Sequence, residues 1–226
     1  MLRQLRQRDA AFDARFFERD ALFAPIAPVA QLFADYTHFP APEALDRALA
    51  ERAGIRFVAA APRPRRQRGP VALADLYDTR IARGEVPTRP NNWHDFLNAL
   101  VWATFPRAKA ALHARQHRAI RAWAFAEASV TRRLPNARTR ELDALALVDE
   151  GGILVSGEAR AVFGHALYEG LVAGVPAMIA RAVPLAEPTD EALAARLAEP
   201  LSPEELPRED LQKDGTSNLS VNSLPG

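Results

Sequence analysis

The chain of 226 residues is 48% hydrophobic and 25% charged, and its formal net charge is +1. These proportions exclude a disordered protein and predict a chain long enough to bury one core. The sequence contains no cysteine, which excludes disulfides, thiolate nucleophiles and zinc sites built on cysteine. Any metal site would need histidine and carboxylate ligands.

Helices dominate the predicted secondary structure. Helical patterns cover residues 4–23, 42–53, 72–82, 93–104, 106–130, 157–173 and 191–198. Strands are predicted at 55–60, 144–148, 153–156 and 177–183. The run ALALVDEGGILVS predicts a β-hairpin near 144–156, with Asp149, Gly151 and Gly152 in its turn. We therefore expect an α+β fold, a predominantly helical single domain with a small sheet.

The domain is expected to span residues 1–210. Residues 211–226 are poor in large apolar side chains and rich in Ser, Asn and Gly, which predicts a disordered polar tail. The first residues carry charges throughout, unlike a secretory signal, and the apolar stretch 21–34 is too short to cross a bilayer. We expect a cytoplasmic protein that does not associate with membranes.

The segment TRPNNWHDFLNALVWATFP, residues 88–106, is the best site candidate in the sequence. Asn92 is a good N-cap and Asp95 lies where a capping box places its acid, so a helix is predicted from Trp93. One side of this helix is apolar. The other side carries groups that can hydrogen-bond or line a pocket: His94, Asp95, Asn98 and Trp102.

His94 is the preferred functional residue among the five histidines, because it falls in the first helical turn. The positive end of the helix dipole disfavours an imidazolium there, and a neutral imidazole can act as base, donor or metal ligand. Arg89 would hold an anionic group. A structural alternative is open, in which Asp95 only caps the helix, Asn98 is solvated and His94 is an ordinary hydrogen-bonded histidine.

Two further histidine arrangements compete with this helix. His165 and Glu169 lie one turn apart on the helix predicted after Ser156, where they can share a metal or act as a base and its orienter. They also fit an ordinary i,i+4 pair on a solvated face. His113 and His117 have the spacing of two zinc ligands but lack the glutamate of an HExxH motif, so we interpret them as part of a basic face.

The near-neutral charge conceals a strong asymmetry. Residues 107–140 contain nine basic residues and one acid, whereas acids outnumber arginines between 141 and 210. A second basic cluster is PRPRRQRGP at 62–70. Basic segments can neutralise phosphates, but pairing between the two halves of the fold needs no ligand. We favour internal pairing and do not expect nucleic-acid binding.

Three stretches, GEVPTRPNNWHDFLNALVWATFPRAKAAL, RELDALALVDEGGIL and FGHALYE, resemble the bacterial domain-of-unknown-function family numbered 3025. The likeness covers the chain between about Leu45 and Leu185. That family has no established activity, so the resemblance implies kinship and a bacterial origin without a mechanism. It places seven residues in the family's recognisable blocks: His94, Asp95, Asn98, Asp143, Asp149, His165 and Glu169.

The sequence contains no GxGxxG, GxxxxGK[ST] or GxSxG motif. This excludes the common glycine-rich nucleotide-binding loops and the nucleophile elbow of serine hydrolases. What remains is an acid/base or metal site. Its candidate catalytic residues are His94, Asp95, His165 and Glu169, and its candidate binding residues are Arg89, Asn92, Asn98, Trp102 and Asp149.

We interpret the chain as a small hydrolase-type enzyme with a polar His/Asp/Glu pocket around the helix NNWHDFLNALVW, which acts on a small-molecule or anionic ligand. Its metal and cofactor are unknown. Two other functions are compatible with the sequence. One is a non-catalytic module that binds an anionic partner or nucleic acid through its Arg-rich segments. The other is a structural or adaptor protein, in which the polar residues of these motifs only hold helices together through hydrogen bonds.

Overall fold

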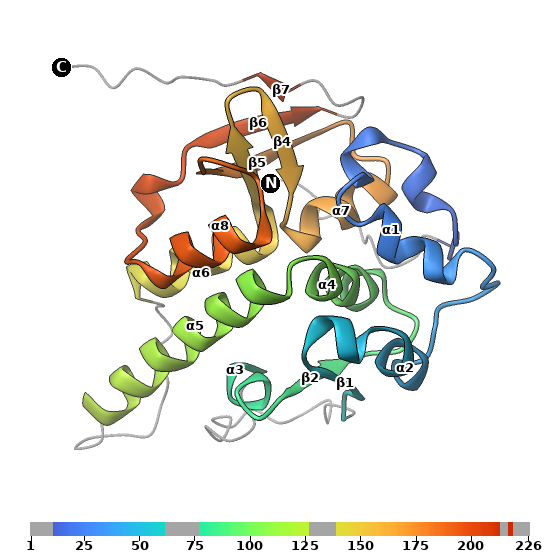
Figure 1. Cartoon of the computed structure of the whole chain (residues 1–226), viewed down its shortest axis with the longest axis horizontal. Coiled ribbons are helices and arrows are strands. Elements are labelled where there is room, and N and C mark those ends of the chain that lie inside the picture. The colour runs from blue at the N-terminus through green and yellow to red at the C-terminus, as the bar shows by residue number, and fades with distance from the viewer. Residues whose placement is uncertain (1–10, 62–76, 127–138, 213–216, 219–226) are drawn as a thin grey trace, which may run out of the picture.

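The computed structural model describes residues 11–61, 77–126, 139–212 and 217–218. Helices α4 (Trp93–Thr104) and α5 (Pro106–Ala126) follow one another through the middle of the molecule. A five-stranded sheet lies on one side of them and a two-stranded sheet on the other (Figure 1). The predicted α+β fold class, mostly helical with little sheet, is confirmed.

The N-terminal part consists of short helical turns instead of the long helix predicted at 4–23. They are η2 (Phe16–Glu18), η3 (Ala21–Phe23), α1 (Ala27–Ala30) and η4 (Gln31–Phe33). A side-chain oxygen of Asp20 accepts a hydrogen bond from the Leu22 backbone N–H at 2.9 Å, which starts a new turn where a continuous helix would have run. Residues 4–10 of that prediction lie outside the described residues.

A second unit packs beside α4. Helix α2 (Pro42–Ala53) forms as predicted and ends at Gly54, whose positive φ of 64° suits the left-handed C-cap. Strand β1 (Arg56–Ala59) pairs in parallel with β2 (Glu85–Thr88), and α3 (Tyr77–Ile81) precedes β2. Strand β2 was not predicted. The basic cluster at 62–70 and the start of the predicted helix 72–82 lie outside the described residues.

The larger sheet has the order β4-β3-β5-β6-β7. Its strands are β3 (Gly152–Ser156), β4 (Ala159–Val162), β5 (Ala177–Pro184), β6 (Arg208–Gln212) and β7 (Ser217–Asn218). Strands β3 and β5 are parallel, and the other neighbouring pairs are antiparallel. The remaining elements are α6 (Arg140–Gly151), α7 (His165–Val172), α8 (Asp190–Ala198) and η6 (Pro203–Glu205).

The hairpin predicted near 144–156 is wrong in its first strand. Residues 144–148 belong to α6, because the Thr139 side chain caps the helix by accepting from the Leu142 N–H at 3.2 Å. The hairpin is displaced along the chain to β3 and β4, with Gly157 at φ 54° in its turn. The helix predicted at 157–173 therefore begins only at His165, and Ser156 ends a strand.

Two residues of the predicted disordered tail, Leu211 and Gln212, complete strand β6, and Ser217–Asn218 form β7. The other tail residues lie outside the described residues. In the segments that are described, none of the helices combines the length and the apolar character needed to cross a bilayer.

The core surrounds α4, which is buried on nearly all sides instead of having one apolar and one polar face. Phe96, Leu100, Leu145, Phe163 and Leu167 are buried in this core. Leu147 is only partly buried and packs against it.

Replacing Leu100, whose side chain is fully buried, by Ala should lower the free energy of unfolding by about 2–5 kcal/mol. Leu32→Ala is the matched control, because Leu32 is 54% exposed, and it should change stability by no more than about 0.5 kcal/mol. Urea unfolding of both variants measures the difference. Equal stability of the two variants, or unprotected amides over Trp93–Thr104 in hydrogen exchange, would contradict the packing described above.

Candidate functional site

Helix α4 presents His94 in its first turn. The Asn92 side chain accepts a hydrogen bond from the Asp95 backbone N–H at 3.0 Å, so Asn92 is the predicted N-cap and not a ligand-facing residue. Trp93, the first helical residue, packs edge to face against Phe16 with ring centroids 5.2 Å apart. The cap and this aromatic contact fix the start of α4, and with it the direction of the His94 side chain.

His94 lies between the two candidate residues of α7. Its Nδ1 is 3.1 Å from Glu169 Oε2, and its Nε2 is 3.0 Å from His165 Nε2. An ionised carboxylate only accepts hydrogen bonds, so His94 donates its Nδ1–H to Glu169. The two Nε2 atoms then share one proton. The structure thus brings together three of the four candidate catalytic residues. In the sequence, His94 is 71 residues from His165 and 75 residues from Glu169.

The two imidazoles differ in electrostatic environment. The hydrogen bond from His94 to Glu169 raises the pKa of His94 despite its partial burial, which is the opposite direction to that expected from the helix dipole. His165 is almost completely buried, and burial lowers the pKa of His165 to about 3. His165 is therefore neutral at physiological pH, and one of its ring nitrogens carries no proton and can accept a hydrogen bond or bind a metal.

Glu150 is a member of this cluster that the sequence analysis missed. Its Oε2 lies 3.5 Å from His165 Nε2, and its side chain is 52% exposed. Partial burial, with the neighbouring Asp149 carboxylate, raises the pKa of Glu150. Because residues 149–152 were interpreted as a hairpin turn, their position at the end of a helix facing α7 could not be anticipated.

Gly164 explains why the end of α6 and the start of α7 approach so closely. A Cβ atom at this position would lie 2.5 Å from the Glu150 carbonyl oxygen and 2.6 Å from Gly151 Cα, both of them backbone atoms. Only glycine permits this contact, which sets His165 next to Asp149 and Glu150.

Asp95 and Arg89 do not take the roles predicted for them. The Arg89 guanidinium donates to both carboxylate oxygens of Asp95, at 2.8 and 2.6 Å, and the Arg89 backbone N–H adds a third bond at 2.6 Å. Asp95 therefore fixes the loop before α4 instead of orienting His94. Arg89 is engaged by this carboxylate and is not a free anion-binding group.

Asn98 and Asp149 are joined through a buried lysine. The fully buried Lys109 ammonium donates to Asn98 Oδ1 at 2.8 Å and to Asp149 Oδ1 at 2.5 Å. Asn98 in turn donates to the Tyr77 hydroxyl at 3.0 Å. Burial alone would raise the pKa of Asp149, but the Lys109 charge, with smaller contributions from the neighbouring histidines, holds it well below its usual range.

Trp102 lines no open pocket. It is buried and stacks on His113, with ring centroids 5.4 Å apart and planes 7° from parallel. His113 Nδ1 lies 2.9 Å from Asp78 Oδ1, so this histidine is held by α3 and does not form a zinc pair with His117. Among the described residues, the cluster of potential metal ligands consists of His94, Glu150 and His165.

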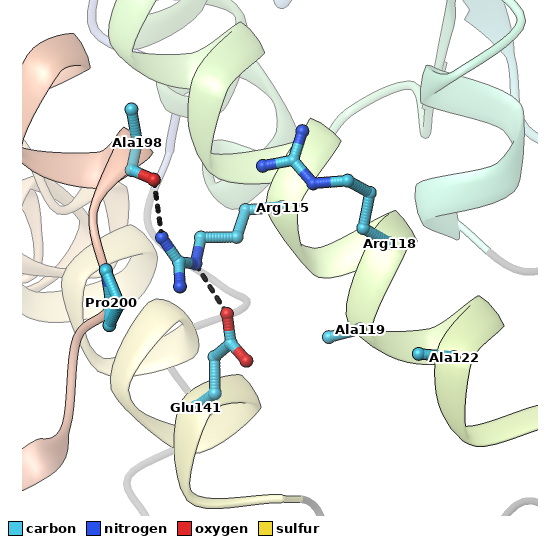
Figure 2. A pocket seen from close by; sticks show the side chains of 7 residues that line it. All are labelled: Arg115, Arg118, Ala119, Ala122, Glu141, Ala198 and Pro200. Atoms are coloured by element: carbon cyan, nitrogen blue, oxygen red, sulfur yellow. Dashed lines mark hydrogen bonds and ion pairs between the residues drawn. The ribbon is translucent and has the colours of Figure 1, made fainter. Parts of the chain in front are cut away.

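The expected internal pairing of the basic segment is confirmed for several residues. Arg107 pairs with Glu191, Arg115 with Glu141 and Arg140 with Glu204. Figure 2 shows Arg115 bonded to Glu141 and to the Ala198 carbonyl beside a cavity of about 430 Å³. Arg118 lies next to it on α5. Arg132, Arg133 and Arg138 are outside the described residues.

A second, larger hollow of about 800 Å³ has Glu150 among its lining residues. Leu167 of α7 and Met178 and Ile179 of β5 give it an apolar lining. Two guanidinium groups, Arg181 and Arg208, line it as well and belong to residues paired across β5 and β6. We call this hollow the Glu150 groove.

Replacing Asp149 by Asn should lower the free energy of unfolding by about 3–5 kcal/mol, because it leaves the Lys109 charge buried without a carboxylate partner. Glu191→Gln is the matched control. It removes the carboxylate of an ion pair whose two side chains are 66% and 62% exposed, so little stability should be lost. Chemical denaturation checks both, and a fully stable Asp149→Asn variant would show that the buried pair does not hold these helices together.

Comparison with known proteins agrees with the resemblance noted in the sequence. The model of the family described as Protein of unknown function (DUF3025) matches residues 65–162. No curated protein and no solved structure matches the chain. The matched segment contains His94 and Glu150 and stops before His165 and Glu169. Over residues 65–162 this chain is therefore similar to a family of unknown function.

Proposed function

We propose that the chain is a small hydrolase whose active centre is formed by His94, His165 and Glu169. The observation that supports this most strongly is the convergence of two imidazoles and a carboxylate from α4 and α7, with the Nε2 atoms 3.0 Å apart. The His94 side chain is 31% exposed, whereas that of His165 is 3% exposed. One imidazole thus faces solvent and the other is held in the protein interior.

Each residue has a distinct role in this proposal. Glu169 orients His94 through its Nδ1–H and stabilises positive charge on that ring. Neutral His165 supplies a second nitrogen directed at the same point. With the hydrogen bond between the two rings broken, Nε2 of His94 would take one proton from an attacking water while the water oxygen bonds to the substrate, and Glu169 would stabilise the imidazolium that results. Asp95, Asn98 and Asp149 support the centre by fixing α4, α5 and α6 and do not touch the substrate.

The Glu150 groove suggests the class of substrate. Glu150, whose carboxylate lies 3.5 Å from His165, is one of its lining residues, so a molecule bound in the groove would lie next to the centre. Its apolar lining suits an acyl or other apolar group. Within the described residues, Arg181 and Arg208 form no ion pair, although Arg181 donates to the Leu206 carbonyl at 3.2 Å. Two such guanidinium groups suit an anionic group at the far end of the substrate.

A hydrolase screen with p-nitrophenyl octanoate, p-nitrophenyl phosphate and N-acyl amino acids tests the proposal. His94→Ala and Glu169→Gln should lower turnover of any hydrolysed compound by about 10²–10⁴-fold while remaining folded. His38→Ala, at an exposed loop position, is the matched control and should keep full activity. Arg208→Gln should raise KM for the anionic compounds and leave kcat unchanged.

A structural role for the same residues gives a different result. Removing a buried hydrogen-bond partner typically costs about 1–3 kcal/mol of stability. Destabilised His94→Ala and Glu169→Gln variants, together with no hydrolysis by the wild-type protein, would reject the proposed activity and favour the adaptor function.

A further inference from the structure

Three potential ligand atoms from three different helices face one another at this centre. They are Nε2 of His94 on α4, Nε2 of His165 on α7 and a carboxylate oxygen of Glu150 at the end of α6. All three lie within 4.8 Å of one another. Two of the separations are shorter, 3.0 Å between the imidazole nitrogens and 3.5 Å from His165 to Glu150.

The two shorter separations match those between ligands of one metal ion, and the third is no longer than 4.8 Å. Histidine and carboxylate ligands lie about 2.0–2.2 Å from zinc, which places tetrahedral neighbours about 3.3–3.5 Å apart. In a six-coordinate site adjacent ligands are closer, about 3.0 Å apart. Little movement of the side chains would be needed for all three atoms to contact one ion. Two histidines and one carboxylate also form a donor set that catalytic zinc and non-haem iron sites use.

The surroundings of both imidazoles support the same assignment. A histidine bound to a metal usually donates its other ring N–H to a carboxylate or carbonyl. His94 already makes such a bond to Glu169 at 3.1 Å. In the described part of the chain, the buried Nδ1 of His165 has no hydrogen-bond partner, and Asp149 Oδ1 lies 3.9 Å from it. Metal binding at Nε2 would put the proton on Nδ1, where it faces that carboxylate.

The charges near the centre are those that a divalent cation would neutralise. Lys109 pairs with Asp149, and Arg89 pairs with Asp95, so each of these pairs is neutral. This leaves Glu150 and Glu169 as two carboxylates on either side of the imidazole pair. A single M²⁺ ion would balance them.

We infer that His94, His165 and Glu150 bind one divalent transition-metal ion, with Glu169 and Asp149 orienting the two imidazoles. This inference deepens the proposed function, because it assigns the activation of water at the same centre to a metal. A water in the remaining coordination position would lose one proton to solvent and become a hydroxide nucleophile near neutral pH. The side chains of His94 and Glu150 are 31% and 52% exposed, which leaves that position accessible to solvent.

Metal binding can be measured on the full chain without any substrate. The purified protein is stripped with a chelator and titrated with Zn²⁺ in competition with a chromophoric chelator, and the bound metal is counted by elemental analysis. Wild type should bind one Zn²⁺ per chain, and His94→Ala should lose this binding. Glu169→Gln should bind about 10–100-fold more weakly, because it loses only the residue that orients His94. The visible spectrum of the Co²⁺-substituted protein then distinguishes four-coordinate from six-coordinate binding. If the site prefers iron, Fe²⁺ should displace Zn²⁺ in a competition titration.

Matched variants separate loss of a ligand from loss of the fold. Glu150→Gln changes a half-exposed carboxylate and should weaken binding without changing the melting temperature of the metal-free protein. Glu158→Gln, in the β3–β4 turn, and His117→Ala, on α5, should bind as wild type does. The metal site would be overturned if wild type bound neither Zn²⁺ nor Fe²⁺ stoichiometrically. It would also be overturned if both His94→Ala and Glu150→Gln bound the metal as wild type does.

The outcome also separates this inference from the proposed hydrolase. Metal binding by wild type with no hydrolysis supports the metal site and rejects the activity. Hydrolysis that persists undiminished in the stripped protein supports the activity and rejects the metal.

Discussion

The buried charge of Lys109 is the constraint on which the arrangement of the centre depends. A lysine ammonium in the protein interior is tolerated only if it is paired and hydrogen-bonded. Here Asn98 on α4 and Asp149 on α6 both accept from it, and Lys109 itself belongs to α5. The three helices can therefore pack in only one register. That register places His94, four residues before Asn98, opposite the residues that follow Asp149.

The imidazole pair is a second unusual arrangement. Two rings with centroids 4.4 Å apart, one of them almost fully buried, must share a proton or a cation to avoid lone-pair repulsion. A core that needed only to be stable would be served as well by apolar side chains of similar size. The presence of two histidines and two flanking carboxylates in one small volume is the feature on which the proposed activity rests.

Local signals in the sequence were sufficient for α4, because Asn92 caps the helix and the apolar residues recur at helical spacing. They were ambiguous at 144–148, where the alternation in ALALV fits a strand as well as one face of a helix. Tertiary packing and the Thr139 cap decided in favour of α6. Propensity in such a short segment is weaker than burial against the sheet.

The composition of the centre was only partly predictable. His94, His165 and Glu169 could be proposed as functional residues from their chemistry and helical position. Their convergence depends on how α4 packs on α7, and no spacing along the chain encodes that contact. Glu150 was missed because its helix was read as a turn, and Asp95 was misassigned because an acid in a first turn can bond to a preceding arginine as readily as to a histidine.

The centre is divided between two parts of the chain, with His94 on one side of residues 127–138 and Glu150, His165 and Glu169 on the other. The two parts also meet where the Arg107 and Ala108 backbone N–H groups donate to Asp190 at the start of α8. Neither part holds more than one of the two imidazoles. Two separate polypeptides divided at this point would each carry an incomplete centre, and only their complementation into a heterodimer would restore it.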